Sequence, residues 1–352
     1  MSRAELLDAA PWSLAPADKD PRMTAALLEL TRLHGERCAP YARILSGAFD
    51  GWEGAARPSD VPWLPVSLFK SHELRSVPEA DVFKVVASSG TTTGRASRVA
   101  LDRETAALQS RVLLKLLAGF VGSARLPMLV ADHAPGGGRA INARYAATVG
   151  VMPLGRDVLY ALDEELRLRT DAVAAWLEKH REGPLLVFGF TFVFWKHVVQ
   201  AVRPGALDLS RATLLHTGGW KRLEAERVDN AAYKRACLEK TGLARVHNFY
   251  GMAEQVGTVF VECERGFLHA PAPADCIIRD ERTWEPVAPG GRGVVEVLSV
   301  LPTSYPGHAL LTEDLGTLVG LDGCACGRRG THFLVNGRAP RAELRGCSDT
   351  RA

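Results

Sequence analysis

Short apolar runs alternate with longer amphipathic runs through the middle of the chain, as expected for buried strands separated by surface helices. The runs that we interpret as strands are Val82–Val86, Met128–Ala131, Leu185–Phe188, Thr213–His216 and Arg245–Tyr250. The runs that we interpret as helices are one from its N-cap Asp102 to Leu117, Ala140–Val149, a segment capped by Thr170, and Arg222–Lys240, which stops at Gly242. This alternation predicts an α/β fold with a mostly parallel sheet and helices on its faces.

The two ends of the chain have other patterns. Apolar residues between Ala25 and Leu33 follow a helical spacing that closes at His34 and Gly35, so residues 1–60 are expected to form a helical segment packed on the main body. Two prolines in Pro62–Lys70 exclude a helix and predict an extended segment. Beyond about residue 255, Val294–Val300 and Leu310–Val319 indicate a β-rich portion. We therefore expect a large domain over 61–338 and a short tail over 339–352.

Composition narrows the class of protein. The chain has 352 residues, of which 47% are hydrophobic and 24% charged, as in globular proteins that bury a large core. A net charge of +3 gives no reason to expect nucleic acid or a membrane surface as a partner. No apolar run is long enough to span a bilayer and no secretory signal follows Met1, so we expect a cytoplasmic protein. Seven cysteines then indicate reduced thiols, a metal site or a reactive cysteine.

One polar stretch lies between two predicted elements. It consists of Ser88, Ser89, Gly90, Thr91, Thr92, Thr93, Gly94 and Arg95. A buried-looking run, Val82–Ala87, precedes it, and Arg98–Leu101 resembles the return arm of a hairpin. Because glycine lets the backbone approach a ligand closely, this stretch predicts a phosphate-holding loop, although without the Gly-Lys-Ser/Thr ending of a Walker loop. The alternative is a flexible linker.

Two further glycine-bearing turns, Gly218-Gly219 and Tyr250-Gly251, also follow predicted strands. Ligands of open α/β sheets bind outside the carboxyl ends of the strands, so the three turns are expected to converge on one crevice.

The residues in these stretches, and their order along the chain, resemble the motifs of the adenylate-forming enzymes, a superfamily that includes acyl-CoA synthetases and adenylation domains. The resemblance rests on the Ser88–Gly94 loop, His216-Thr217-Gly218-Gly219-Trp220-Lys221, Asn248–Glu254, Leu311-Thr312-Glu313-Asp314 and Gly337-Arg338. A closer likeness is to the LuxE-type acyl-protein synthetases, which are fatty acid ligases. It is carried by Pro65–Lys70, Gly189-Phe190-Thr191, the His216–Lys221 stretch and Arg345-Gly346-Cys347. Phenylacetate-CoA ligases are more distant.

The resemblance implies the adenylate-forming fold and a nucleotide site. The Ser88–Gly94 loop would hold the β- and γ-phosphates of ATP, and Gly218, Gly219, Tyr250 and Gly251 would form the adenine slot. Glu254 would help to hold Mg²⁺, a hard cation that prefers oxygen ligands. Asp314 would accept hydrogen bonds from the ribose, while Arg338 would reach the ribose or phosphates. For each residue alone, a purely structural role is the alternative.

The resemblance also implies the reaction. A fatty or aryl carboxylate attacks the α-phosphorus of ATP, which gives acyl-AMP and pyrophosphate, and Lys221 or Arg338 would offset the repulsion between the two anions. The acyl group then passes to a thiol. The thiol is Cys347 itself, which would deliver the acyl group to a reductase partner, or CoA, or a carrier protein. If Cys347 is an ordinary tail cysteine, one of the other two acceptors applies.

The sequence departs from the superfamily pattern in several places. The loop has an extra threonine, Arg95 and Arg98 stand where Pro-Lys is common, and Ala253 replaces a usual threonine. Only a short tail follows Arg338, so the C-terminal lid domain is expected to be absent or trimmed. Two other functions therefore stay open: a phenylacetate-type CoA ligase, or a nucleotide-binding interaction protein without turnover.

Two further features concern a metal and the acid. Cys263, His269, Cys324 and Cys326 form a reasonable tetrahedral set for a structural zinc ion, with reduced cysteines as the alternative. The aromatic run Phe188–Trp195 is expected to be core; if part of it lines a cavity, it implies an apolar acyl or aryl acid.

Overall fold

The computed structural model describes residues 2–88, 96–135, 143–220 and 226–339. Within them the helices are α1 (Ser2–Asp8), α2 (Pro16–Arg37), α3 (Ala39–Ala48), α4 (Leu68–Ser71), α5 (Arg103–Val121), α6 (Ala143–Val151), α7 (Thr170–Lys179), α8 (Thr191–Phe194) and α9 (Asn230–Thr241). The strands are β1 (Leu64–Pro65), β2 (Lys84–Ala87), β3 (Arg98–Leu101), β4 (Leu126–His133), β5 (Gly155–Leu162), β6 (Leu185–Phe190), β7 (Ala212–Thr217), β8 (Arg245–Tyr250), β9 (Phe260–Glu262), β10 (Leu268–His269), β11 (Ala274–Arg279), β12 (Arg292–Ser299), β13 (Ala309–Gly320) and β14 (His332–Arg338).

Twelve of the described strands form one mixed sheet, in the order β11-β12-β13-β14-β10-β9-β8-β7-β6-β4-β5, with β1 beside β13. Neighbours from β5 to β8 pair in parallel. From β8 to β11 the pairing is antiparallel. The α/β class with a β-rich portion is therefore confirmed, and the two parts belong to a single sheet.

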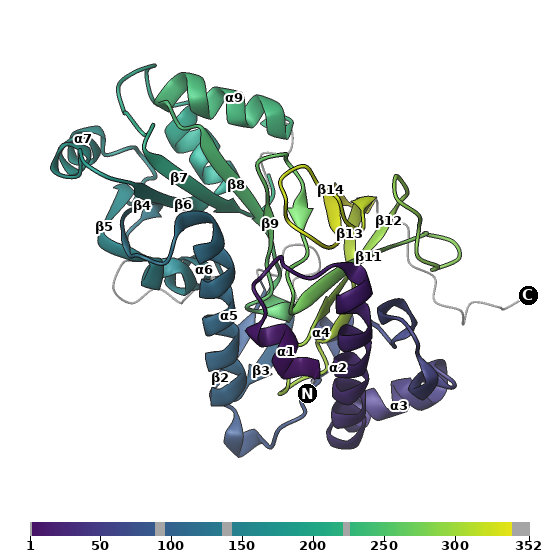
Figure 1. The fold of residues 1–352 in the computed structure, drawn as a ribbon. Coiled ribbons are helices and arrows are strands. Elements are labelled where there is room, and N and C mark those ends of the chain that lie inside the picture. Colours follow the sequence, from purple (N-terminus) through teal and green to yellow (C-terminus); the bar gives the residue numbers. More distant parts are fainter. Residues whose placement is uncertain (1, 89–95, 136–142, 221–225, 340–352) are drawn as a thin grey trace, which may run out of the picture.

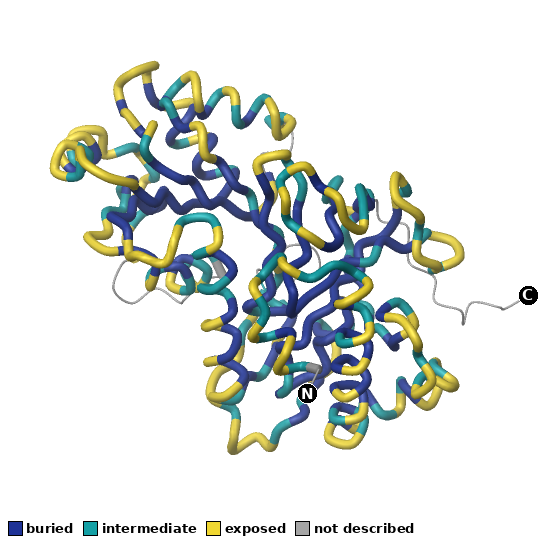
Figure 2. The backbone as a smooth tube through the Cα atoms, viewed as in Figure 1, coloured by how far each residue is buried: buried dark blue, intermediate teal, exposed yellow. Residues whose placement is uncertain are grey.

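Helices cover the parallel part on both faces (Figure 1): α9 lies on one side of β6, β7 and β8, and α5 and α6 lie on the other. Strands β6 and β7 are buried along their whole length, whereas the outer faces of the helices are exposed (Figure 2). The N-terminal helices pack elsewhere: Leu27 and Leu30 of α2 share a core with Leu298 and Ala309 of the antiparallel strands. No described helix is long and apolar enough to cross a membrane.

Several predicted element boundaries were correct. Asp102 caps α5, because its Oδ1 accepts a hydrogen bond of 2.7 Å from the N–H of Thr105. Gly242, in the left-handed conformation at φ 72°, ends α9. Arg98–Leu101 is the return arm of a hairpin with β2, as expected.

Other boundaries were wrong for identifiable reasons. The helix α9 begins at Asn230 rather than Arg222, because Asp229 is its N-cap and accepts from the N–H of Ala232. The helix predicted to close at His34 continues to Arg37. Thr170 lies inside α7, whose N-cap is Arg169. In Pro62–Lys70 the prolines precede a short helix, α4, which begins three residues after Pro65 and so escapes their constraint.

The run Val82–Ala87 is not a buried strand. Its last four residues form β2, which pairs only with β3 in a two-stranded ribbon outside the large sheet. Phe83 and Val85 are 49% and 47% exposed. The apolar composition predicted the extended conformation correctly but not the burial, which depends on whether another element covers the strand.

Candidate active site at the ends of the parallel strands

The strand order contains a switch point, where successive strands are added on opposite sides of the first. After β4 the chain adds β5 on one side and then β6 on the other, so the switch lies between β4 and β6. The carboxyl ends of β6, β7 and β8 follow on from it, with Phe190 opposite Thr217 and Thr217 opposite Phe249. Ligands of open α/β sheets bind in this position.

The Gly218-Gly219 turn leaves the end of β7 directly beside the end of β8. Gly218 has φ +82°, and a Cβ at this position would lie 3.2 Å from Cδ1 of Phe190, so both backbone and packing require glycine. Its carbonyl accepts a 2.7 Å hydrogen bond from Oγ1 of Thr191. A Cβ at Gly219 would meet no atom within 4 Å, so this exposed glycine borders open space.

Tyr250, at the end of β8, contacts Asp314 of β13. The tyrosine hydroxyl donates a 2.7 Å hydrogen bond to Oδ2 of Asp314. Burial raises the pKa of Tyr250 well above its usual range. Burial also raises the pKa of Asp314, and the hydrogen bond from Tyr250 partly opposes this shift. The two residues are 64 positions apart in sequence, so the sheet brings together two motifs that the sequence keeps separate.

Charged side chains surround this pair. Arg338 of β14 lies opposite Asp314 in the strand register, is exposed, and places Nη1 3.6 Å from Oε2 of Glu313. Lys70, at the end of the Pro65–Lys70 stretch, donates a 2.9 Å hydrogen bond to Oε1 of Glu313. The link between Lys70 and Glu313 had no signal in the sequence.

The turn after Tyr250 carries the predicted magnesium ligand. Gly251 has a close neighbour, because a Cβ there would lie 3.1 Å from the carbonyl oxygen of Thr258. Glu254 is buried in the 3₁₀ turn Ala253–Gln255, and β3 packs against this turn. The β2–β3 ribbon therefore lies near Glu254 through its strand β3. Ser88 closes the loop end of the ribbon: its N–H donates to the carbonyl of Ser97, and its hydroxyl accepts from the N–H of Ser97, both at 3.0 Å.

Several predicted site residues lie outside the described part of the chain. They are Ser89, Gly90, Thr91, Thr92, Thr93, Gly94, Lys221 and Cys347. Of the three glycine-bearing turns, the described structure places two side by side, Gly218-Gly219 and Tyr250-Gly251.

One residue that our sequence reasoning missed is Asn248, two positions before Tyr250. Its backbone N–H donates to Oε2 of Glu262 at 3.2 Å, but its side-chain Oδ1 is buried and has no partner among the described residues. Such an atom is normally hydrogen-bonded. Asn248 lies in the predicted motif, so its position was visible in the sequence but its unpaired oxygen was not.

Cys263, His269, Cys324 and Cys326 meet in a second cluster at the ends of two hairpins. Their ligand atoms lie within 4.8 Å of one another, and Sγ of Cys326 is 3.4 Å from Nε2 of His269. Backbone N–H groups of Arg265 and Arg328 donate to Cys263 and Cys326, each at 3.4 Å. Three sulfur atoms and one imidazole nitrogen at this spacing fit a tetrahedral metal ion such as zinc.

The pKa values of the cluster thiols differ. Burial raises the pKa of Cys263 to about 11. Burial alone would also raise that of Cys326, but hydrogen bonds from Arg328 and the neighbouring thiols outweigh it and lower the pKa. A metal ion binds cysteine as the thiolate, so a bound ion would favour the deprotonated form of all three thiols.

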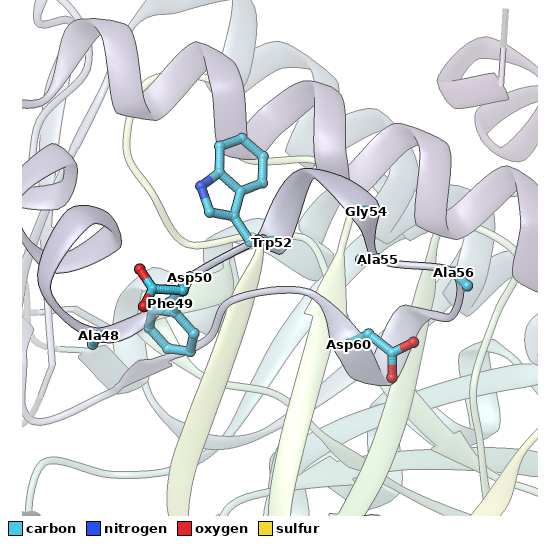
Figure 3. Close-up of a pocket in the computed structure, with 9 residues that line it drawn as sticks. Ala48, Phe49, Asp50, Trp52, Gly54, Ala55, Ala56 and Asp60 are labelled. Atoms are coloured by element: carbon cyan, nitrogen blue, oxygen red, sulfur yellow. The ribbon is translucent and has the colours of Figure 1, made fainter.

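A cavity of about 390 Å³ lies away from both clusters, in the N-terminal segment 48–60 (Figure 3). Its lining includes Phe49, Asp50, Trp52 and Asp60. None of the residues predicted to bind a nucleotide or a metal contributes to it, so we do not assign it to the active site.

Comparisons with known proteins agree with this architecture. The family model described as acyl-protein synthetase, LuxE, matches residues 3–352. A long-chain-fatty-acid–luciferin-component ligase of Aliivibrio fischeri is 23% identical over 266 residues, which are 73% of this chain and 69% of that protein.

Solved structures are similar in fold. An open conformation of 2-hydroxyisobutyryl-CoA ligase, crystallised with 2-HIB-AMP and CoA, has a TM-score of 0.70 at 16% identity, covering 94% of this chain and 73% of that one. ATP-bound MatB from Rhodopseudomonas palustris has a TM-score of 0.50 at 17% identity, covering 75% of this chain and 49% of that one. At these identities the similarity establishes an adenylate-forming ligase fold.

Proposed function

Because this chain belongs to the acyl-protein synthetase (LuxE) family of acid–thiol ligases, we propose that it activates a carboxylic acid with ATP and transfers the acyl group to a thiol. The observation that carries the proposal is the 2.7 Å contact between Tyr250 and Asp314 beside the Gly218-Gly219 turn. It supports a nucleotide site at the carboxyl ends of the parallel strands.

The residues around this contact suit the parts of ATP. Tyr250 offers a ring for the adenine, beside the exposed and sterically open Gly219. The unpaired Oδ1 of Asn248 is an acceptor for the exocyclic amino group of adenine. Asp314 offers a second carboxylate oxygen to the ribose hydroxyls while Tyr250 holds the first.

We assign the binding of the ATP phosphates to the Ser88–Gly94 loop and the binding of their counter-ion to Glu254. The ribbon that carries Ser88 at its loop end packs through β3 against the turn that carries Glu254, which supports assigning both to the phosphates. Within the described residues, no hydrogen bond or ion pair reaches the carboxylate of Glu254. We propose it as a ligand of Mg²⁺, which when bound neutralises charge on the phosphates.

The first step needs no covalent group on the enzyme. An oxygen of the substrate carboxylate attacks the α-phosphorus of ATP, the bond to the β-phosphate oxygen breaks, and pyrophosphate leaves with that electron pair. The protein holds the two anions in line and offsets their repulsion. Lys221 and the exposed Arg338 are the cations that we propose for this purpose.

We propose Cys347, CoA or a carrier-protein thiol as the acyl acceptor. A thiolate attacks the acyl carbonyl and AMP leaves, which forms a thioester. The variant Cys347→Ser distinguishes the acceptors: loss of covalent labelling by radioactive acid would support self-acylation. Unchanged CoA-dependent AMP release would support a phenylacetate-type CoA ligase.

The function is tested by pyrophosphate exchange into ATP with a panel of fatty and aryl acids. We expect acid-dependent exchange that requires Mg²⁺. ATP binding without exchange for any acid would contradict the proposal and favour a nucleotide-binding interaction protein.

We also propose that the Cys263, His269, Cys324 and Cys326 cluster holds a structural zinc ion. All four positions are filled by side chains, which leaves no open position for a reacting group.

A further inference from the structure

Four aromatic side chains pack together on the face of β7 that α9 covers. They are Trp195 from the π-helical turn after α8, His216 from β7, Trp220 after the glycine turn, and Tyr233 from α9. Tyr233 stacks on His216 with ring centroids 4.9 Å apart and on Trp195 at 5.7 Å. Trp220 meets Trp195 edge-on at 5.6 Å. We call this set the aromatic cluster.

Three polar atoms of the aromatic cluster have no hydrogen-bond partner in the described structure. They are Nε1 of Trp195, Nε2 of His216 and the hydroxyl oxygen of Tyr233. The side chains that carry them are 9%, 3% and 2% exposed. Buried polar atoms are nearly always paired, so three in one cluster indicate a polar group that binds there.

The hydrogen bonds of Thr191 determine what kind of group this is. Its hydroxyl lies 2.7 Å from the carbonyl oxygen of Gly218 and 2.9 Å from Nδ1 of His216. A hydroxyl has one proton and a carbonyl can only accept, so Thr191 donates to Gly218 and accepts from the Nδ1–H of His216.

The imidazole of His216 is neutral, because burial lowers its pKa to about 3. With the proton on Nδ1, its Nε2 carries a lone pair and needs a donor. The Nε1–H of Trp195 needs an acceptor, and the hydroxyl of Tyr233 can act as a donor or as an acceptor. A hydroxyl group donates and accepts, whereas a carbonyl or an ether cannot pair with His216 and an alkyl chain pairs with none of the three.

The aromatic cluster lies beside the proposed site of acid activation. His216 is one residue from the end of β7, and its partner Thr191 directly follows the end of β6. The turn that leaves His216 borders open space at Gly219. An acid whose carboxylate is held at the strand ends would thus lie next to the cluster.

We propose that the aromatic cluster recognises the distal end of the acid, and that this acid carries a hydroxyl group which donates to Nε2 of His216 and accepts from Trp195 or Tyr233. The inference rests on the proposed function and specifies its substrate as a hydroxylated aryl or medium-chain acid. A water molecule has the same chemistry, and the experiment separates the two.

The experiment compares matched acids by pyrophosphate exchange: benzoate with 3- and 4-hydroxybenzoate, and octanoate with 8-hydroxyoctanoate. We expect at least one hydroxy acid to have a kcat/KM about tenfold or more above that of its unsubstituted partner, because the unsubstituted acid leaves the buried atoms unpaired. Acid binding is also measured by the shift in melting temperature without ATP.

The variant Tyr233→Phe removes only the hydroxyl from the cluster. We expect the ratio of kcat/KM between hydroxy acid and unsubstituted acid to fall about tenfold, and the melting temperature not to fall, because no partner is lost. The matched control is Tyr41→Phe, whose buried hydroxyl lies 3.3 Å from Nε2 of His308. It should lower the melting temperature and leave the ratio unchanged.

Each outcome decides between the alternatives. Equal or better exchange with the unsubstituted acids, or a ratio that Tyr233→Phe does not move, would overturn the inference and indicate a structural water, while the ligase function would stand. If no acid supports exchange, the proposed function fails, and the melting-temperature measurement still tests the inference. A rise in melting temperature that requires the hydroxyl of the acid and is abolished by Tyr233→Phe would support the inference. The absence of such a rise would overturn it.

Discussion

Neighbouring glycines in the turn after β7 have different reasons to be glycine. Gly218 is required by its positive φ and by Phe190, so any side chain there strains the fold. Gly219 has neither constraint, because a Cβ would meet no protein atom within 4 Å. The space beside Gly219 is therefore free for a ligand, which is what the proposed adenine site requires.

The variant Gly219→Ala tests this difference. We expect its free energy of unfolding to stay within about 0.5 kcal/mol of the wild type, while the KM for ATP in the exchange assay rises on the order of tenfold, because the methyl group intrudes on the base. The control Gly47→Ala, in α3 with equally open surroundings, should leave the KM unchanged. A normal KM for Gly219→Ala would place the adenine elsewhere.

A second prediction at the residue scale concerns Asp314. Replacement by alanine removes the carboxylate that Tyr250 holds and that we assign to the ribose. Hydrogen bonds to charged groups contribute about 1.5–3 kcal/mol, so we expect the KM for ATP to rise about ten- to a hundredfold. Glu281→Ala, an exposed carboxylate outside the site, is the control. Equal effects of the two variants would exclude Asp314 from nucleotide binding.

At the scale of elements, short polar contacts decide where helices begin. Asp102 and Asp229 each accept a 2.7 Å hydrogen bond from the N–H three residues later, and the helix starts immediately after each of them. Asp102 also joins the β2–β3 ribbon to α5, since β3 ends at Leu101. The β2–β3 ribbon thus runs directly into a helix cap, while Val99 and Leu101 of β3 share a core with residues of the large sheet.

We expect Asp102→Ala to destabilise the protein by about 1 kcal/mol, the usual effect of losing a helix N-cap. The measurement is the urea midpoint at constant slope. Asp229→Ala should act similarly on α9, whereas Asp171→Ala, inside α7 where Asp171 is not the N-cap, should have a smaller effect. A midpoint unchanged by Asp102→Ala would show that packing alone defines this helix start.

At the scale of the whole molecule, the proposed metal site connects segments far apart in the chain. Cys263 directly follows β9 and His269 is the last residue of β10, while Cys324 and Cys326 lie between β13 and β14. The loop of the second pair also holds the N-terminal segment, because the N–H of Arg329 donates to the carbonyl of Trp12 and the guanidinium of Arg328 lies over its ring. A metal ion would therefore stabilise the contact between the β13–β14 loop and the N-terminal segment around Trp12.

The variant Cys324→Ser tests the metal. We expect the purified wild type to contain about one zinc ion per chain, and the variant to lose it together with on the order of 5 °C or more in melting temperature. Cys38→Ser, at the junction of α2 and α3 and outside the cluster, should retain the zinc. Metal-free wild type with the same melting temperature would show that the thiols are simply reduced.

A buried histidine pair joins α2 to the segment before β13. His34 and His308 stack at 5.2 Å, and burial lowers the pKa of His34 to about 3 and that of His308 well below its usual range. In the unfolded chain both titrate near pH 6.5. Below that pH the unfolded state binds protons that the native state excludes, so the free energy of unfolding falls with pH until the native pKa is reached.

We expect the free energy of unfolding to fall by about 2 kcal/mol or more between about pH 6.5 and 4.5 on account of this pair. Glu296, whose pKa is raised to about 7 by burial, acts in the opposite direction, so the comparison uses urea midpoints of the wild type and His34→Gln. The variant should lose less stability than the wild type on acidification. Parallel pH dependences would exclude His34 as the cause.

Much of the fold could be predicted from the sequence because its signals are local. Periodicity indicated the strands of the parallel sheet, Asp102 and Gly242 indicated helix ends, and the ordered motifs indicated the family. The wrong predictions concern burial and helix starts. The sequence did not show that Phe83 and Val85 would stay largely exposed, or that Asp229 rather than a residue near Arg222 would cap α9.

The sequence by itself determined the extended and helical segments, the family and the candidate ligands, since each depends on residues close together in the chain. Only the tertiary structure decided which of them meet. The contact of Tyr250 with Asp314, the meeting of Cys263, His269, Cys324 and Cys326, and the unpaired atoms around Tyr233 all depend on strand order and register across the sheet. Those are set by the packing of distant segments, for which no local pattern carries a signal.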